Sequence, residues 1–157
     1  MPDMLVKLYD LPPLQPALDR QMQNGIDVRR GIAPEKNLAL RWVRENFREH
    51  WVGECDIAYS RSPVTCFVAL QEQNVLGFAC YDTTRKGFFG PIGVSEAARG
   101  KDVGSALLLA CLHDMWHQGY GYAIIGAAGP VDFYAKTVGA IVIEGSEGGV
   151  YKGMLRE

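Results

Sequence analysis

A short basic loop in front of a long helical pattern is the most informative chemical feature of the sequence. Arg99, Gly100 and Lys101 follow a predicted strand, 88–94, and an amphipathic helical pattern begins near Asp102. The first N–H groups of a helix have no acceptor within that helix and point outward, so a strand, a loop and a helix start in this order form a site for an anion. The sequence therefore predicts that this loop binds an anionic group.

Size and charge limit what that anion can be. The 157 residues are 48% hydrophobic and 22% charged, the balance of one globular domain that buries its own core. The net charge of −2 provides no global field for nucleic acid or anionic lipid. We therefore expect a small-molecule ligand, with neither nucleic acid nor a membrane as a partner.

Targeting segments and metal-binding patterns are not evident. The first residues lack a basic segment followed by an apolar run, so we expect a cytoplasmic protein. The four cysteines form no C-x-x-C pair, and three lie in apolar runs typical of buried, reduced thiols. His113 and His117 have the spacing of a zinc-binding pair, but no third ligand is evident, and an outer helix face explains them better. The sequence thus predicts no metal site.

The elements that position the loop follow from the hydrophobic patterns. Segment 1–24 contains a short apolar stretch, 4–9, predicted as a strand, and a short helix, 14–23. We expect segment 1–24 to be an N-terminal arm packed on a single domain formed by residues 25–157. The apolar stretch can pair with a sheet edge within the chain or between chains, in a homodimer.

The domain itself is predicted to combine helices with a largely antiparallel sheet. Its expected strands and helices, in chain order, are 26–30, 33–47, 51–59, 65–70, 75–81, 88–94, 102–118, 122–126, 130–138 and a strand pair within 140–155. This order predicts an α+β or mixed α/β fold, with a central, mostly antiparallel sheet flanked by helices. Two glycines and a proline within 88–94 predict a bulge, which frees backbone groups to face a ligand.

Two motifs resemble the GNAT superfamily of N-acetyltransferases, which acylate amines with acetyl-CoA. Residues 99–104 are similar to the superfamily's pyrophosphate signature, Q/R-x-x-G-x-G/A, with Asp102 where its first glycine usually stands. Phe133 and Tyr134 are the first residues of a pattern at the end of the last helix that is also typical of the superfamily. Ala127 stands where the superfamily frequently has an asparagine. The resemblance covers about residues 26–157 through the order of elements.

The resemblance implies a GNAT-like acyl-CoA N-acyltransferase fold with a bulged fourth strand and with acetyl-CoA as the cosubstrate. The implied cofactor-binding residues are Ile92, Gly93, Val94, Arg99, Gly100, Lys101, Asp102, Val103, Gly104, Ser105 and Phe133. Backbone N–H groups near Ile92 and Val94 can polarise the thioester carbonyl, and the strand can pair with the pantetheine amides. Tyr134 takes the position of the superfamily's usual general acid, which protonates the departing thiolate.

The general base and the acceptor are less clearly encoded. Because an amine is mostly protonated at neutral pH, a carboxylate, a histidine or a chain of waters must remove a proton, and Glu54 and Asp56 border the expected acceptor groove. Glu144 and Glu147 give the C-terminal turn an acidic character that suits a cationic amine. We expect the Asp102 carboxylate to fold onto the N–H groups of the following helix as a cap.

The function expected from these features is transfer of an acetyl group from acetyl-CoA to a primary amine of a small molecule or peptide, by direct attack in a ternary complex. Two alternatives stay open. One is an acyl-CoA-binding module with little or no catalysis. The other is a nucleotide or phosphosugar binder of a different fold.

Overall fold

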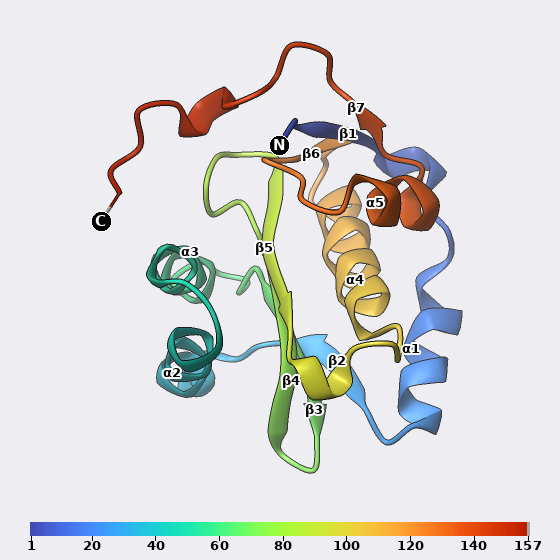
Figure 1. Cartoon of the computed structure of the whole chain (residues 1–157). Helices are drawn as coiled ribbons and strands as arrows, with labels where there is room; N and C mark the ends of the chain where they lie inside the picture. The colour runs from blue at the N-terminus through green and yellow to red at the C-terminus, as the bar shows by residue number, and fades with distance from the viewer. Residues whose placement is uncertain (157) are drawn as a thin grey trace.

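A seven-stranded sheet forms the centre of the chain in a computed structural model that describes residues 1–156 (Figure 1). Its strands are β1 (Met4–Lys7), β2 (Asp27–Arg30), β3 (Cys66–Gln71), β4 (Asn74–Tyr81), β5 (Phe88–Val94), β6 (Tyr122–Ile125) and β7 (Ile141–Val142). They are arranged in the order β2-β3-β4-β5-β6-β1-β7. Only β5 and β6 are parallel, whereas every other neighbouring pair is antiparallel. The predicted fold class is therefore confirmed.

Helices cover both faces of this sheet (Figure 1). The helices α2 (Lys36–Asn46) and α3 (Glu49–Tyr59) lie on one face, and α1 (Leu14–Gln23), α4 (Val103–His117) and α5 (Val131–Val138) lie on the other. Short 3-10 turns occur at Leu8–Asp10, Ala33–Glu35, Glu96–Ala98 and Gly149–Tyr151. Across residues 1–156, no helix has the length and apolar character needed to cross a membrane.

Successive side chains of each strand point to opposite faces of the sheet, so the strands contribute to two separate cores. On β3 and β4 the residues that face α2 and α3 are Cys66, Val68, Phe78 and Cys80. The intervening residues that face α4 are Ala69, Ala79 and Tyr81. Because α4 is covered by the sheet, α1 and α5, nine of its 15 residues are buried, including all of 106–112, which explains why the middle of its sequence is uniformly apolar.

The N-terminal segment is built into the sheet. Strand β1 pairs antiparallel with β6 on one side and with β7 on the other, so both of its edges are occupied within the chain. On the β7 side this pairing is limited to Met4 and Leu5. The helix α1 packs on α4, and Gln21 donates a hydrogen bond to the backbone oxygen of Lys101 at 2.8 Å, which ties this segment to the basic loop.

Strand β5 contains the irregularity that its glycines and proline predict. Ala79 on β4 lies opposite Ile92, but Tyr81 lies opposite Phe89, so β5 holds one extra residue at the Gly90–Pro91 step. This bulged strand is the fourth strand within residues 25–157, as expected, and the fifth of the chain when β1 is counted. Its pairing with β6 is limited to two positions, at Phe88 and Phe89, beyond which the two strands separate.

The second strand of the predicted C-terminal pair does not form. Only Ile141–Val142 forms a strand, and it pairs with β1. The following chain crosses the end of the sheet to the side of α3, where Gly149–Tyr151 makes a 3-10 turn (Figure 1). Four glycines in this stretch, at 145, 148, 149 and 153, have positive φ angles. Such angles are incompatible with a continuous strand.

Candidate functional site

A pocket of about 220 Å³ lies where β5 leads into α4. It is lined by Val94, Ala98, Arg99, Gly100, Asp102, Val103, Gly104, Ser105 and Phe133. All of these except Ala98 are among the residues that the sequence predicts to bind the cofactor. Phe133 comes from α5, far along the chain, so tertiary folding joins the two motifs in one pocket.

The electrostatics of this pocket favour an anion. The N–H groups of Val103, Gly104 and Ser105 belong to the first turn of α4, where the helix provides no acceptor for them and where its dipole is positive. The side chains of Arg99 and Lys101 are exposed beside this turn and add two positive charges. A phosphate or pyrophosphate group matches these donors in charge and in hydrogen-bonding capacity.

Asp102 differs from the expectation that it caps the helix with its side chain. It stands at the N-cap of α4 with φ 60° and ψ 20°, and its carboxylate makes no capping hydrogen bond. This left-handed conformation is one that glycine adopts without steric cost and that aspartate tolerates. This backbone conformation explains why glycine is usual at this position of the superfamily's signature. Because aspartate stands here instead, an exposed carboxylate lies on the wall of the anion pocket.

The backbone of β5 presents polar groups to an edge that β6 does not cover. Ser95 N–H donates to the backbone oxygen of Leu76 on β4 at 2.8 Å. Because hydrogen-bonding direction alternates along a strand, the N–H and C=O groups of Ile92 and Val94 point away from β4. Since β5 and β6 pair only at Phe88 and Phe89, these groups face the opening between the two strands.

Three of the predicted cofactor-binding residues do not line the pocket. Gly93 faces α2 and α3, and a Cβ atom there would lie 2.6 Å from the ring of Phe47, so this glycine allows close packing. The Ile92 side chain packs against the core on the side of α4. Lys101 accepts the hydrogen bond from Gln21 through its backbone oxygen, while its side chain extends into solvent.

Tyr134 lies beside the paired start of β5. Its ring makes edge-to-face contacts with Phe89 at 6.5 Å and with Phe133 at 5.1 Å between ring centroids. Only 5% of its surface is exposed, and burial raises the pKa of Tyr134 to about 12. The phenol therefore keeps its proton at neutral pH, as a proton donor must.

Glu54 projects from α3 toward the loop between β4 and β5. Its carboxylate accepts a hydrogen bond from the hydroxyl of Thr84, and burial raises the pKa of Glu54, while His50, one turn earlier on α3, opposes that rise. Tyr151 contacts the same threonine, and a Cβ atom on Gly126, next to the end of β6, would lie 2.5 Å from the Tyr151 hydroxyl oxygen. Thr84 was not predicted from the sequence, because a threonine in a polar loop carries no distinguishing signal.

The other carboxylates considered as site residues have different surroundings. Asp56 is exposed and forms a 2.6 Å ion pair with Lys36, which lowers the pKa of Asp56. Glu147 accepts a hydrogen bond from the N-terminal ammonium of Met1 at 2.7 Å. Glu144 is exposed. Of these acidic residues, only Glu54 combines partial burial with a position beside the β4–β5 loop.

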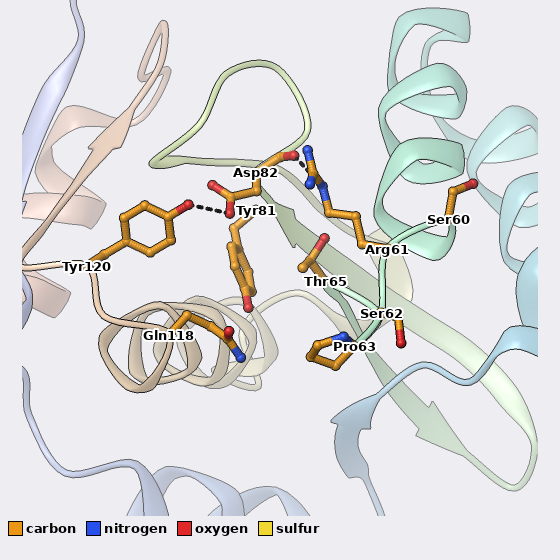
Figure 2. Close-up of a pocket in the computed structure, with 9 residues that line it drawn as sticks. All are labelled: Ser60, Arg61, Ser62, Pro63, Thr65, Tyr81, Asp82, Gln118 and Tyr120. Carbon is orange, nitrogen blue, oxygen red and sulfur yellow. Dashed lines mark hydrogen bonds between the residues drawn. The ribbon is translucent and has the colours of Figure 1, made fainter.

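A larger pocket, of about 360 Å³, lies at the other end of α4 (Figure 2). One of its lining residues, Asp82, accepts hydrogen bonds from the Tyr120 hydroxyl at 2.6 Å and the Gly87 N–H at 2.7 Å. Arg61 donates to the backbone oxygen of Asp82 at 2.9 Å. These bonds fix both ends of the loop 82–87, which carries Thr84. The pocket therefore adjoins the loop whose threonine donates a hydrogen bond to Glu54.

Comparison with solved structures finds the same fold at low sequence identity. The glucosamine N-acetyltransferase region of a fungal multi-domain β-N-acetylglucosaminidase aligns with a TM-score of 0.74 and 14% identity, covering 90% of this chain and 19% of that one. A GCN5-related N-acetyltransferase from Sphaerobacter thermophilus has a TM-score of 0.66 and 18% identity over 90% and 48% of the two chains. One from Kribbella flavida has 0.62 and 16%, over 90% and 53%. This chain thus spans about half or less of these relatives.

The sequence itself identifies the family. No curated protein matches this sequence. The profile of the acetyltransferase (GNAT) family matches residues 33–140, which include the α2–α3 face, the bulged strand, the anion pocket and both aromatic residues that begin α5. This match covers more than half of the chain, and the fold agrees with it. The chain therefore belongs to the GNAT acetyltransferase family.

Proposed function

We propose that this protein transfers an acetyl group from acetyl-CoA to the primary amine of a small molecule or peptide, by direct attack within a ternary complex. The observation that carries the proposal is the open edge of β5. This edge runs from the region of Tyr134 to the anion pocket at the start of α4. Its length and polarity suit an extended pantetheine arm with a pyrophosphate at one end and a thioester at the other.

Each residue group has a chemical role in this scheme. The first turn of α4, with Arg99 and Lys101, binds the pyrophosphate, and the outward backbone groups of Ile92 and Val94 pair with pantetheine amides or polarise the thioester carbonyl. Glu54 takes a proton from the ammonium form of the acceptor. The amine nitrogen then forms a bond to the carbonyl carbon, the carbon–sulfur bond breaks, and Tyr134 protonates the leaving thiolate. The proton that the nitrogen loses on becoming an amide restores the Tyr134 phenol.

The decisive variant is Tyr134→Phe, which removes the donor and keeps the ring contacts. We expect kcat to fall by about 10²–10⁴-fold, the usual contribution of a general acid, while the Kd for acetyl-CoA stays the same. Steady-state kinetics and calorimetric titration measure the two quantities. The amine panel includes glucosamine, because a region of similar fold is named as a glucosamine N-acetyltransferase. Tyr122→Phe, at a half-exposed tyrosine on β6, is the matched control.

The two alternatives give different results in the same assays. If the parent protein binds acetyl-CoA but acetylates no amine of the panel, the chain is an acyl-CoA-binding module and the proposed reaction is refuted. If ATP or NAD raises the melting temperature and acetyl-CoA does not, the pocket belongs to a nucleotide binder. Full activity of Tyr134→Phe would remove this residue from the mechanism.

A further inference from the structure

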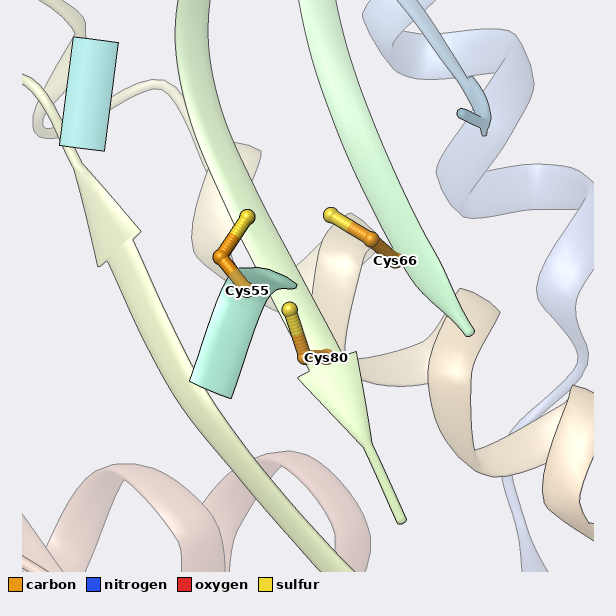
Figure 3. Close-up of side chains that lie close together, drawn as sticks. All are labelled: Cys55, Cys66 and Cys80. Carbon is orange, nitrogen blue, oxygen red and sulfur yellow. The ribbon is translucent and has the colours of Figure 1, made fainter. Parts of the chain in front are cut away.

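Three cysteines from three different elements meet under α3 (Figure 3). Cys66 on β3 and Cys80 on β4 are register partners, and Cys55 on α3 lies over them. All three are free thiols with 0% exposure. They lie on the opposite face of the sheet from the fourth cysteine, Cys111, which is equally buried in α4.

The strand register brings two of these thiols close together. Tyr81 N–H donates to the backbone oxygen of Thr65, so the adjacent pair, Cys66 and Cys80, is the kind that exchanges no backbone hydrogen bonds. Side chains of such pairs point to the same face and approach most closely. The Sγ atoms of all three cysteines lie within 4.8 Å of one another.

This spacing is close to what a metal ion requires. A zinc–sulfur bond is about 2.3 Å, so three sulfurs around one ion are separated by about 4 Å. Small rotations of the cysteine side chains bring the present triangle to that size. Thiolate sulfur is the ligand that soft ions prefer, and the site contains no competing carboxylate or imidazole among the described residues.

Charge favours a divalent ion over a monovalent one. Each cysteine that ligates a metal loses its proton, so three thiolates carry three negative charges. A divalent ion leaves one net negative charge in this apolar core, whereas a monovalent ion leaves two, and buried charge is costly.

An unpartnered hydroxyl belongs to the same core. Tyr59 lies one turn after Cys55 on α3, and its hydroxyl oxygen is buried without a hydrogen-bond partner. Burial and the neighbouring Cys66 and Cys55 thiols raise the pKa of Tyr59, so this hydroxyl keeps its proton. The hydroxyl makes no hydrogen bond to the cysteines and lies against Gly31, where a Cβ atom would be 2.3 Å from its oxygen, so Tyr59 is a neighbour of the three thiols and not a ligand.

We propose that Cys55, Cys66 and Cys80 form a binding site for a thiophilic divalent metal ion, Zn²⁺ in particular, which fastens α3 to strands β3 and β4. Binding replaces the thiol protons by one ion and involves no redox change. The proposal is independent of acetyl transfer. Because the sulfurs are fully buried, the ion enters during folding or when α3 opens.

The test measures metal binding directly on the full chain. The protein is unfolded with a thiol reductant and refolded with one equivalent of Cd²⁺ or Zn²⁺, then freed of loosely held ions by gel filtration. We expect one ion per chain by elemental analysis, a cadmium–thiolate charge-transfer band in the ultraviolet, and a melting temperature above that of the metal-free protein. Cys66→Ala and Cys80→Ala should each lose the band and the rise in melting temperature.

Matched variants separate a metal site from ordinary core packing. Cys111→Ala removes an equally buried thiol outside the cluster and should keep the band and the stoichiometry. Tyr59→Phe, which removes a buried hydroxyl that has no hydrogen-bond partner, should also keep the band and the stoichiometry. Because an alanine variant can fail to fold, circular dichroism of each variant and the Cys55→Ser substitution, which preserves size, accompany the series.

Two results would overturn the proposal. One is a refolded parent protein, with native circular dichroism, that retains less than a tenth of an equivalent of either ion. The other is a charge-transfer band that survives in folded Cys66→Ala, Cys80→Ala or Cys55→Ser but is lost in Cys111→Ala. Either would leave the three thiols as apolar core residues, the role that buried free cysteines usually have.

Discussion

Individual residues in this protein gain their chemical properties from the elements that surround them. Glu54 and Asp56 are two positions apart on α3, yet one is partly buried against the Thr84 loop and the other forms an exposed ion pair with Lys36. The pKa of Glu54 is consequently raised, and that of Asp56 is lowered. The same residue class on one helix therefore differs in proton affinity because helix rotation points the two side chains in different directions.

Glu54→Gln removes the proposed proton acceptor and keeps an oxygen for Thr84. We expect kcat/KM for the amine at pH 7 to fall by about 10²-fold or more, with unchanged affinity for acetyl-CoA. A base works only when deprotonated, so activity of the parent falls as pH drops through the Glu54 pKa. Since burial raises that pKa, the fall begins at higher pH than for an exposed glutamate.

The neighbouring carboxylate serves as the control for this variant. Asp56→Asn should retain the kcat/KM and the acidic limb of the parent, because Asp56 is directed away from the site. If Glu54→Gln and the parent have the same kcat/KM throughout the pH range, Glu54 is not the base. Water would then be the proton acceptor.

Helix α4 shows how one element can join two distant parts of a site. Its first turn forms one wall of the anion pocket, and its last residues lead to Tyr120, which fixes Asp82 at the base of the Thr84 loop. A helix of 15 residues is about 22 Å long, so α4 sets the distance between these two regions. Asp102, at the start of α4, has a left-handed backbone conformation that glycine adopts more easily than aspartate.

Substitution of Asp102 separates charge from backbone strain. Asp102→Gly should bind CoA about 3–10-fold more tightly, because an exposed negative charge near the pyrophosphate is removed. It should also raise the free energy of unfolding by up to about 1 kcal/mol, because glycine adopts φ 60° without strain. Calorimetric titration and urea unfolding measure the two effects.

Asp102→Asn is the matched control, since asparagine also tolerates the left-handed region but carries no charge. It should reproduce the gain in CoA affinity without the gain in stability. If neither variant binds CoA more tightly than the parent, the carboxylate does not face the bound pyrophosphate.

At the scale of the whole molecule, one polar network joins the distant edge of the sheet to the central helix. Arg30 on β2 makes two hydrogen bonds to Asp114 on α4, at 2.9 and 2.6 Å, and a third to the backbone oxygen of Val64 at 2.7 Å. The Tyr81 hydroxyl on β4 also donates to Asp114, which has a side chain only 12% exposed. Asp114 therefore lies against the sheet.

Removal of the charge at this junction should destabilise the fold. In Asp114→Asn, the Arg30 guanidinium loses its anionic partner and Tyr81 loses its strongest acceptor. We expect the free energy of unfolding, measured with urea at neutral pH, to fall by about 2–3 kcal/mol. Glu45→Gln, at an exposed position on α2, should change it by less than about 0.5 kcal/mol. A loss that small in Asp114→Asn would show that the network contributes little.

The sequence alone determined the features that depend on local interactions. The apolar pattern of 14–23 and the helix-ending Asn24-Gly25 sequence predict the helix that the structure has there. The bulge in β5 follows from Gly90 and Pro91. The basic loop and the start of α4 were predictable for the same reason. Proline, glycine and helix-terminus chemistry act within a few residues of the chain.

Only the tertiary structure decided which distant residues meet. The insertion of β1 between β6 and β7, the pairing of Glu54 with Thr84 and the convergence of three cysteines under α3 each join segments well separated in sequence. Local pattern also failed at the C-terminus, where only two residues of the expected strand pair join β1 and glycines with positive φ angles follow. Strand order and register are set by burial of the whole core, which no short stretch of sequence encodes.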